Sequence, residues 1–410
     1  MWIRVLQAIL HKGIRAGRLR VQFPDGSTGQ YGAGPGTEAQ LTITDPDLPR
    51  RIVLNPQLAL GEGYMDGGLH FPSDEDLRRF LQIAAENVAG GALPLPMRLA
   101  HRLRLGVKPL MQWNTLGVSR RRVRHHYDIP QAFYALFLDE DLQYTCGYFR
   151  DDQMTLAAAQ AAKMDHIAAK LCLQPGQRVL DIGCGWGGLA MYLARRYGVS
   201  VTGITLSPVQ LAAAQAQAAV LGLSGKVDFR LQDYRDVPDR FDRVVSVGMM
   251  EHVGVPQYQA YFDKIHAVLA EDGIGLIHFI GRHTPPRVLS PWFQKYIFPG
   301  GYAPAFSEVI PRVERANLVV ADLEVWRGHY ERTLRHWQTR FRANEPQVRA
   351  MFDDRFIRMW WWYLVSAEVS FTHFGMVLFQ MQIAQQPGAV PRVRDYLYPA
   401  PRADAVSDPA

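Results

Sequence analysis

The sequence predicts an α/β fold in which helices cover both faces of a mainly parallel sheet, preceded by a smaller N-terminal α+β domain. The first observation is that apolar, β-branched runs alternate with helical stretches from about residue 127 onward, which is typical of a parallel sheet with helical crossovers. The second is a glycine-rich turn after the first of these runs. The third is the length of 410 residues, 48% of them hydrophobic, which can bury a sizeable core in more than one domain.

The N-terminal zone, residues 1–95, is expected to be an accessory domain that interacts with lipid. It begins with a basic, amphipathic segment over residues 1–20 and continues through a glycine-rich stretch, 26–36. Ser73 and the three acidic residues after it predict the start of a helix, because serine is a good N-cap and acids suit the positive end of the helix dipole. Glycines and prolines between 87 and 96 mark the end of this zone.

Residues 96–126 are predicted to be a basic linker, a catalytic domain is predicted over 127–398, and 399–410 are predicted to be a disordered tail. The basic side chains of the linker are offset by no acidic residue and are Arg98, Arg102, Arg104, Lys108, Arg120, Arg121, Arg122 and Arg124. Five strands are expected in the catalytic sheet, over residues 179–183, 199–205, 227–233, 241–248 and 273–280.

The segment 179–188, VLDIGCGWGG, places glycines where a buried strand turns into a helix. Such a turn needs residues that tolerate positive φ and let a ligand approach the backbone. Gly183, Gly185 and Gly188 fit the dinucleotide spacing G-x-G-x-x-G as well. The glycines alone therefore do not separate an NAD site from an S-adenosylmethionine site, and a tight turn without a ligand is a further alternative.

Two features favour S-adenosylmethionine. A dinucleotide site expects an acid about 20 residues later for the ribose, but residues 202–207 of this chain are TGITLS. Conversely, Asp181 lies at the end of the strand, where a carboxylate could organise the turn and face a cationic aminoacyl-sulfonium group.

The segment VLDIGCGWGGLA, followed by TGITLSPVQ, LQDYRD and FDRVVSVGMMEHVG, resembles the cyclopropane-fatty-acid synthase and mycolic acid methyltransferase family. The similarity runs from about residue 126 to 396, with a weaker match in the N-terminal zone. It implies a class I S-adenosylmethionine-dependent methyltransferase, Rossmann-like with a mainly parallel seven-stranded sheet. The activity it implies is one-carbon transfer to the cis double bond of an unsaturated phospholipid acyl chain, which gives a cyclopropane.

The resemblance also implies a cofactor site across the ends of the first strands. In it, glycines lie beside the methionine moiety, polar groups contact the nucleoside, two residues flank the adenine, and an aromatic ring near the sulfonium attracts the cation. The residues implied, together with Asp181, are Gly183 and Gly185, then Thr205, Leu206 and Gln210, then Asp233 and Tyr234, and finally Tyr144 and Thr145.

A second cofactor implied by the resemblance is bicarbonate, as the base. After the methyl group adds to the alkene, a proton must leave the new methyl group so that the ring can close, and water must be excluded. The implied binding set is the backbone amides of Cys146 and Ile280 with the side chains of Glu251, His278 and Tyr330. Taken singly, these three side chains are more simply a helix N-terminal acid, a core histidine and a packed tyrosine.

Three positions depart from the family pattern. Ser366 or Ala367 stands where a cysteine is common, Met250 replaces a phenylalanine, and Phe279 replaces a small hydroxyl residue beside His278. We expect the last two to lie next to the base. A methylene-branched or methylated unsaturated acyl chain is therefore an alternative product.

Membrane contact is expected at the N-terminus, where one helical face could enter the lipid surface, or alternatively pack on its own domain. The basic linker offers a second anionic contact. The apolar face comprises Trp2, Val5, Leu6, Ile9 and Leu10, with Arg4, Lys12, Arg15 and Arg18 for lipid phosphates. Aromatic residues that could line an acyl tunnel or fill the core are Trp292, Phe293, Tyr296, Phe298, Trp337, Phe341 and 360–363.

The formal net charge of +6 is compatible with phospholipid at an anionic membrane surface. Nucleic acid is not expected, because no recognised motif accompanies the charge. The three cysteines, Cys146, Cys172 and Cys184, have no metal-site or disulfide spacing, so we expect no metal and a cytoplasmic protein attached peripherally to the inner face of the membrane. The resemblance suggests a homodimer. Alternatives are a small-molecule N- or C-methyltransferase, because plant alkaloid enzymes resemble this family too, and a lipid-binding protein without turnover.

Overall fold

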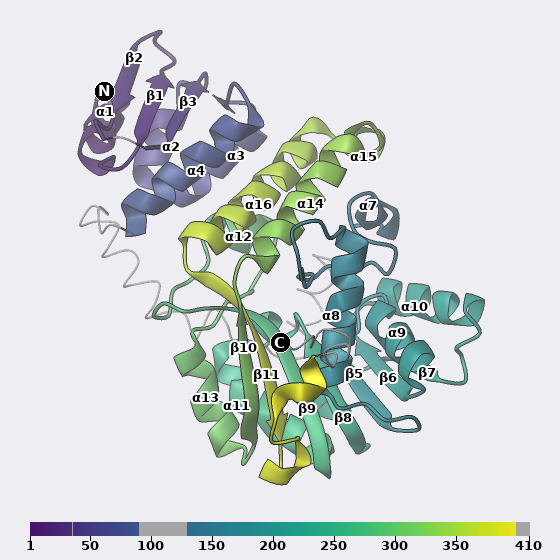
Figure 1. Cartoon of the computed structure of the whole chain (residues 1–410). Coiled ribbons are helices and arrows are strands. Elements are labelled where there is room, and N and C mark those ends of the chain that lie inside the picture. Colours follow the sequence, from purple (N-terminus) through teal and green to yellow (C-terminus); the bar gives the residue numbers. More distant parts are fainter. Residues whose placement is uncertain (35, 90–128, 399–410) are drawn as a thin grey trace, which may run out of the picture.

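A seven-stranded sheet forms the centre of the larger part of the molecule, in a computed structural model that describes residues 1–34, 36–89 and 129–398 (Figure 1). The strand order is β10-β11-β9-β8-β5-β6-β7. The pairs among β5 to β9 are parallel, and β11 runs antiparallel to both β9 and β10. The strands are β5 (Arg178–Ile182), β6 (Ser200–Thr205), β7 (Val227–Leu231), β8 (Phe241–Val247), β9 (Leu269–Arg282), β10 (Val319–Trp326) and β11 (Met376–Ala384).

The five expected strands are confirmed, and β9 begins four residues earlier than expected. Helices cover both faces, as the alternating pattern predicted. One face packs against α8 (Leu156–Lys170), α9 (Gly188–Tyr197) and α10 (Pro208–Val220). The other face packs against α11 (Tyr258–Val268) and α13 (Phe306–Arg315).

A third group of helices lies above the sheet in the view of Figure 1, and its longest member packs against the N-terminal domain. It comprises α7 (Gln131–Ala135), α12 (Pro291–Tyr296), α14 (His329–Ala343), α15 (Glu345–Met351) and α16 (Asp354–His373). Short 3-10 turns are η1 (Tyr234–Asp236), η2 (Met250–His252), η3 (Val255–Gln257), η4 (Pro387–Ala389) and η5 (Arg394–Leu397).

The N-terminal domain has its own four-stranded sheet, in the order β2-β1-β3-β4. The predicted helix at Ser73 is confirmed, because the Asp76 amide donates a hydrogen bond of 3.1 Å to the Ser73 hydroxyl. The elements of this domain are α1 (Trp2–Gly13), β1 (Arg18–Gln22), β2 (Thr28–Tyr31), β3 (Glu38–Ile43), α2 (Leu48–Leu54), α3 (Pro56–Met65), β4 (Leu69–His70) and α4 (Asp74–Ala89).

The N-terminal domain packs on α16 through a continuous apolar core. Ion pairs surround this contact, among them Arg78 with the buried Glu368 at 3.2 Å and Arg342 with Asp74 at 2.6 Å. The predicted linker and tail lie outside the described residues.

The apolar face predicted for helix α1 is only partly exposed to solvent. Leu6 is buried and Leu10 packs against the core of the same domain, whereas Val5 is exposed. Trp2 and Ile9 are half-buried. Only part of the predicted face is therefore available to a membrane. In the described part of the chain, no helix combines the length and the apolar character needed to cross a bilayer.

Candidate active site

The predicted site residues all line one cavity of about 620 Å³ at the carboxyl ends of the parallel strands. This edge, where the strand order reverses beside β5, is the usual ligand site of such sheets. The residues brought together are Tyr144, Thr145, Cys146, Asp181, Gly183, Gly185, Thr205, Leu206, Gln210, Asp233, Tyr234, Glu251, His278, Ile280 and Tyr330.

Two glycines of the turn after β5 have a clear structural role. Gly183 has a φ of +83°, which disfavours any residue with a side chain. A Cβ added to Gly188 would lie 2.3 Å from the Asp141 carbonyl oxygen. The turn can therefore approach the segment around residues 141–147, which forms the opposite side of the cavity.

Asp181 places a buried carboxyl group beside the glycine turn. Its side chain is 2% exposed, and its Oδ2 atom has no hydrogen-bond partner among the described residues. Burial raises the pKa of Asp181 to about 7, and Lys163 opposes this shift. A bound cation would favour the ionised form. The site therefore suits a ligand with a positively charged group.

Two of the residues expected to contact the nucleoside, Thr205 and Gln210, are held by a local hydrogen-bond network after β6. The Thr205 hydroxyl donates to Gln210 Oε1 at 2.8 Å and accepts from the Ser207 amide at 3.2 Å. Ser207 in turn caps α10. These bonds fix Thr205 and Gln210 at the rim of the cavity without any acidic residue.

Asp233 and Tyr234 follow β7. Both carboxylate oxygens of Asp233 accept hydrogen bonds from the Arg235 guanidinium, at 2.8 and 2.9 Å. The ring of Tyr234 packs edge-on against Tyr261 at 5.4 Å, and burial raises the pKa of Tyr234 to about 12. Asp233 therefore carries a compensated charge, and Tyr234 is a neutral part of the wall.

The segment that closes the other side of the cavity is held by α8, through two residues that the sequence analysis missed. Lys163 is fully buried, and its ammonium group donates to Gln143 Oε1 at 2.6 Å and to Thr145 Oγ1 at 2.8 Å. Gln160 donates to the Thr145 carbonyl at 2.8 Å. Burial lowers the pKa of Lys163 to about 8, which nearby acids oppose. Gln160 and Lys163 lie three residues apart on α8, which also carries Asp165, His166 and Lys170, so no signal in the sequence set this pair apart.

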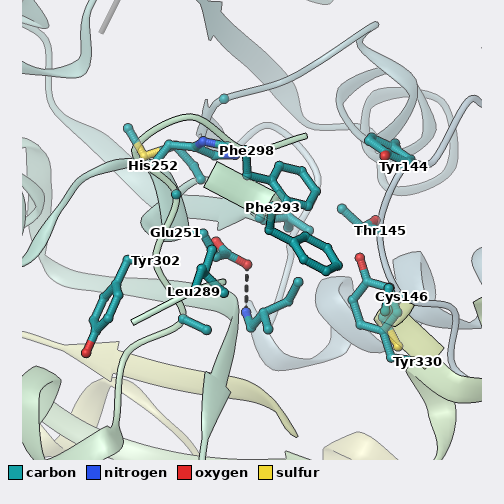
Figure 2. Close-up of a pocket in the computed structure, with 18 of the residues that line it drawn as sticks. Tyr144, Thr145, Cys146, Glu251, His252, Leu289, Phe293, Phe298, Tyr302 and Tyr330 are labelled. Atoms are coloured by element: carbon teal, nitrogen blue, oxygen red, sulfur yellow. Dashed lines mark hydrogen bonds between the residues drawn. The ribbon is translucent and has the colours of Figure 1, made fainter. Parts of the chain in front are cut away.

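Glu251 lies on η2, across the cavity from Cys146 and Tyr330 (Figure 2). Its Oε1 accepts a hydrogen bond of 2.6 Å from the Ile280 amide, whereas its Oε2 is buried without a partner in the described part of the chain. Burial raises the pKa of Glu251 to about 7, which the bond from Ile280 opposes. The Ile280 amide is thus not the available anion donor that we expected, because the buried carboxyl group already uses it.

His278 points into the cavity from β9. The Gln380 side-chain amide donates to His278 Nδ1 at 3.0 Å, which leaves the proton of a neutral ring on Nε2. Nε2 is buried and has no partner among the described residues. Burial holds the pKa of His278 well below its usual range, and Lys163, Lys170 and His166 add to this effect. The ring is therefore a neutral donor.

Cys146 and Tyr330 form the side of the cavity opposite Glu251 (Figure 2). The Cys146 thiol is fully buried beside the hydroxyl of Thr333, and burial raises its pKa, so it is not a nucleophile. The Tyr330 ring stacks on Phe371 at 4.4 Å. Tyr144, farther along, donates from its hydroxyl to that of Tyr363 at 2.8 Å.

The expectation that Met250 and Phe279 lie next to the base is wrong. Both side chains are fully buried in the core between the sheet and α11, on the far side from the cavity. Neighbouring residues of a strand point to opposite faces, so Phe279 points away because His278 points in. Ser366 and Ala367 both line the cavity.

The end of the cavity away from the glycine turn is called the acyl end. Its walls are apolar and come from both domains. Of the predicted aromatic residues, Trp292, Phe293, Phe298, Trp362 and Tyr363 line the cavity. Trp337, Phe341, Trp360 and Trp361 are instead in the buried core, and Tyr296 packs beside it. The N-terminal domain contributes Pro56, Gln57, Leu60, Leu81 and Val88. The described residues contain no group of three His, Cys, Asp or Glu side chains placed to hold a metal ion.

Comparison with known proteins identifies the family. A family model described as mycolic acid cyclopropane synthetase matches residues 116–381. The chain belongs to this family. It is accordingly an S-adenosylmethionine-dependent methyltransferase of the cyclopropane synthase type. A second model, described as a domain of unknown function, matches residues 5–89.

Individual relatives agree with this assignment. The cyclopropane-fatty-acyl-phospholipid synthase of Escherichia coli is 37% identical over 84% of this chain and 87% of its own length. The tuberculostearic acid methyltransferase UfaA1 of Mycobacterium tuberculosis is 34% identical over 90% of this chain and 88% of its own length. The structure of the mycolic acid cyclopropane synthase CmaA1 with SAH and CTAB matches 64% of this chain and 97% of its own, with a TM-score of 0.61 and 32% identity.

Proposed function

We propose that this methyltransferase adds a one-carbon unit from S-adenosylmethionine to the cis double bond of an unsaturated phospholipid acyl chain, and that the product is a cyclopropane. One observation carries the proposal: a single cavity joins the glycine turn, buried polar atoms that have no partner among the described residues, and an apolar end. The name of the E. coli relative, a cyclopropane-fatty-acyl-phospholipid synthase, supports the substrate class.

The cofactor end fits S-adenosylmethionine, which supplies an electrophilic methyl group when it is bound. Asp181 Oδ2 is buried, has no hydrogen-bond partner in the described part of the chain, and can accept a hydrogen bond from a cationic aminoacyl group. Tyr144 and Trp186 also line the cavity, and an aromatic ring near a sulfonium attracts the cation. The SAH bound to the related CmaA1 structure supports this assignment.

The centre of the cavity suits a small oxyanion, and we assign it to bicarbonate, which would supply the base. After methyl transfer the acyl chain is a carbocation, and it must lose a proton from the new methyl group before the ring closes. Neutral His278 donates from Nε2. Glu251, with a pKa near 7, can hold a proton at Oε2 and donate it to an anion that an ionised carboxylate would repel.

The remaining donors of this anion site are the Tyr330 hydroxyl and the Cys146 amide. The Ile280 amide acts indirectly, since its hydrogen bond to Oε1 turns Oε2 of Glu251 toward the cavity. The Tyr302 amide donates to the Glu251 carbonyl at 2.9 Å and so fixes the backbone beneath it. Each donor contributes about 1–3 kcal/mol when buried.

The apolar walls protect the cation from water. Phe293 and Phe298 lie over the centre of the cavity, between Glu251 and the opposite wall (Figure 2). A dry pocket prevents capture of the carbocation by water, and aromatic faces stabilise positive charge.

We further propose that the protein works at the inner, anionic face of the membrane. The support is the exposed part of α1, where Val5 and the half-buried Trp2 lie beside Arg4. Val5→Glu should weaken co-sedimentation with phosphatidylglycerol vesicles. The matched control is Leu54→Glu, which changes another exposed apolar residue of the same domain. Equal binding of both variants would contradict docking through α1.

A methyl- or methylene-branched product is the second candidate, because the M. tuberculosis relative is named a tuberculostearic acid methyltransferase. Met250 and Phe279 do not favour it, since both point away from the cavity.

The test uses purified protein with S-adenosylmethionine and vesicles of a monounsaturated phospholipid. Mass spectrometry should show acyl chains heavier by one CH2, and proton NMR should show high-field ring protons rather than branch methyl or methylene signals. Removing bicarbonate from the buffer should stop turnover, and adding it should restore turnover. Methylation of free amines without any change in the lipid would overturn the proposal. Turnover that is indifferent to bicarbonate would overturn the base assignment alone.

A further inference from the structure

Two arginines that line the cavity have no role in the chemistry proposed above. Arg282 is the last residue of β9, on the same face of the strand as His278 and Ile280. Arg287 follows in the loop between β9 and α12, and both side chains line the cavity. Of the other lining residues with a charged side chain, Arg235 is paired with Asp233, and Asp181 and Glu251 belong to the site described above.

Arg282 is nearly inaccessible to solvent, with 4% of its surface exposed. Its Nε atom donates to the Ala303 carbonyl at 3.2 Å. Tyr302 and Glu308 lie close enough to act on its charge, but the described residues include no ion-pair partner for it. Burial lowers the pKa of Arg282, and repulsion from the nearby Arg287 adds to this.

Arg287 is half-buried in an otherwise apolar wall next to Val288 and Leu289. Within residues 1–34, 36–89 and 129–398, no acidic side chain pairs with it. Keeping a cation in such a place, beside a second cation, costs free energy unless an anion binds there. The neighbouring His283 and Pro285 are exposed, so this loop reaches the surface of the molecule.

We infer that Arg287, with Arg282 behind it, binds the phosphate group of the phospholipid substrate where the acyl chain enters the cavity. A guanidinium matches two phosphate oxygens with two parallel hydrogen bonds. The apolar end would hold the chain while the headgroup stays near the surface loop. This inference rests on the proposed function, because it needs the acyl chain and the phosphate to belong to one molecule.

Binding of a short-chain, saturated phospholipid, kept monomeric in solution, tests the inference without requiring turnover. Tryptophan fluorescence reports the binding, because Trp292 and Trp362 line the cavity. Arg287→Gln should weaken binding of this phospholipid by about tenfold, as expected for loss of a charge-assisted pair. It should leave unchanged the binding of a diacylglycerol with the same chains. Arg287→Lys keeps the charge but not the two parallel hydrogen bonds. Its affinity for the phospholipid should lie between those of the wild type and Arg287→Gln.

The matched control is Arg240→Gln, which removes an exposed arginine outside the cavity and should change neither affinity. SAH affinity should stay the same in all variants. An equal loss for both lipids, or no loss for either, would overturn the inference. Competition by inorganic phosphate at the concentration at which the phospholipid binds would indicate a free-anion site and would overturn it too. Failure of the wild-type protein to methylate any lipid would count against the proposed function, whatever these affinities are.

Discussion

At the cofactor end of the cavity three acidic or hydroxyl side chains lie at or just after the ends of parallel strands, whereas the acyl end is walled by helices from distant parts of the chain. Asp181, Thr205 and Asp233 come from the ends of β5, β6 and β7. Leu60 of α3 and Trp362 of α16 both line the acyl end, although strands β5 to β10 lie between them in sequence. The cofactor end is therefore a product of local motifs, and the acyl end is a product of domain packing.

This difference predicts that substitutions at the two ends impair the binding of different ligands. Damage to the cofactor end should lower SAH affinity and leave lipid binding intact, and damage to the acyl end should do the reverse. Damage to the centre should stop turnover while both ligands still bind.

Glu251→Gln at the centre should have the largest effect. Turnover should fall by at least about 100-fold, the usual contribution of a positioned proton-transfer group, because an amide at this place cannot hold and release the proton. SAH affinity, measured by calorimetry, should stay within about twofold, since Glu251 contributes no bond to the cofactor end. A large loss of SAH affinity would place Glu251 in the cofactor site instead.

Lys163→Met should damage the cofactor end. We expect SAH affinity to fall by about tenfold, because Gln143 and Thr145 lose charge-assisted hydrogen bonds, and Lys163→Arg should recover part of it.

Lys170→Met is the matched control for this prediction. Lys170 is also fully buried on α8, but it pairs with Asp322 and Glu324. It should lower thermal stability without changing SAH affinity. The same loss of SAH affinity in both variants would mean that Lys163 only stabilises the fold.

Ala367→Leu should damage the acyl end. The added volume enters the apolar part of the cavity, so turnover with long-chain lipid should fall by about fivefold, as overpacking of ~1 kcal/mol would give. SAH affinity should not change. A matching drop in SAH affinity would show that the two ends are not independent.

Asp181 should make stability depend on pH. Because its pKa rises from 3.8 to about 7 on folding, the folded chain keeps a proton that the unfolded chain releases between these values. Stability is therefore lost as the pH rises from about 4 to about 7, by up to about 1.4 kcal/mol per unit of pKa shift. Urea unfolding at pH 5 and pH 7 should show a smaller loss for Asp181→Asn than for the wild type. An equal loss in both would exclude Asp181 as the cause.

Ser366→Ala should have the smallest effect. The Ser366 hydroxyl is buried without a hydrogen-bond partner in the described part of the chain, so removing it should change turnover by no more than about twofold. A larger loss would give this hydroxyl group a role in the reaction.

Several features of the site could be predicted because they depend on short stretches of chain. The turn after β5 was recognised from its glycines, and the strands before Thr205 and Asp233 from their apolar runs. The cavity brings together every site residue that the resemblance implied, although their roles stay predictions. The wrong expectation for Phe279 could have been avoided, since neighbouring residues of a strand point to opposite faces and His278 points into the cavity.

Other features had no local signal. Strands β10 and β11 were not predicted, and in β11 the apolar run is broken by Gln380 and Gln382, whose polar groups bond to His278 and to the Lys170 carbonyl. The role of Lys163 was not predicted, because nothing in its neighbourhood in sequence shows that Gln143 and Thr145 lie next to its ammonium group.

The chain's order of residues is enough to establish the strand-turn-helix unit, because backbone sterics and side-chain periodicity act over a few residues. Distances between remote segments depend instead on how buried surfaces fit together. The pairing of Glu251 with the Ile280 amide, the raised pKa of that carboxyl group and the apolar end shared with the N-terminal domain all follow from burial. Burial is a property of the packed molecule, since it excludes water only when segments from the whole chain have come together.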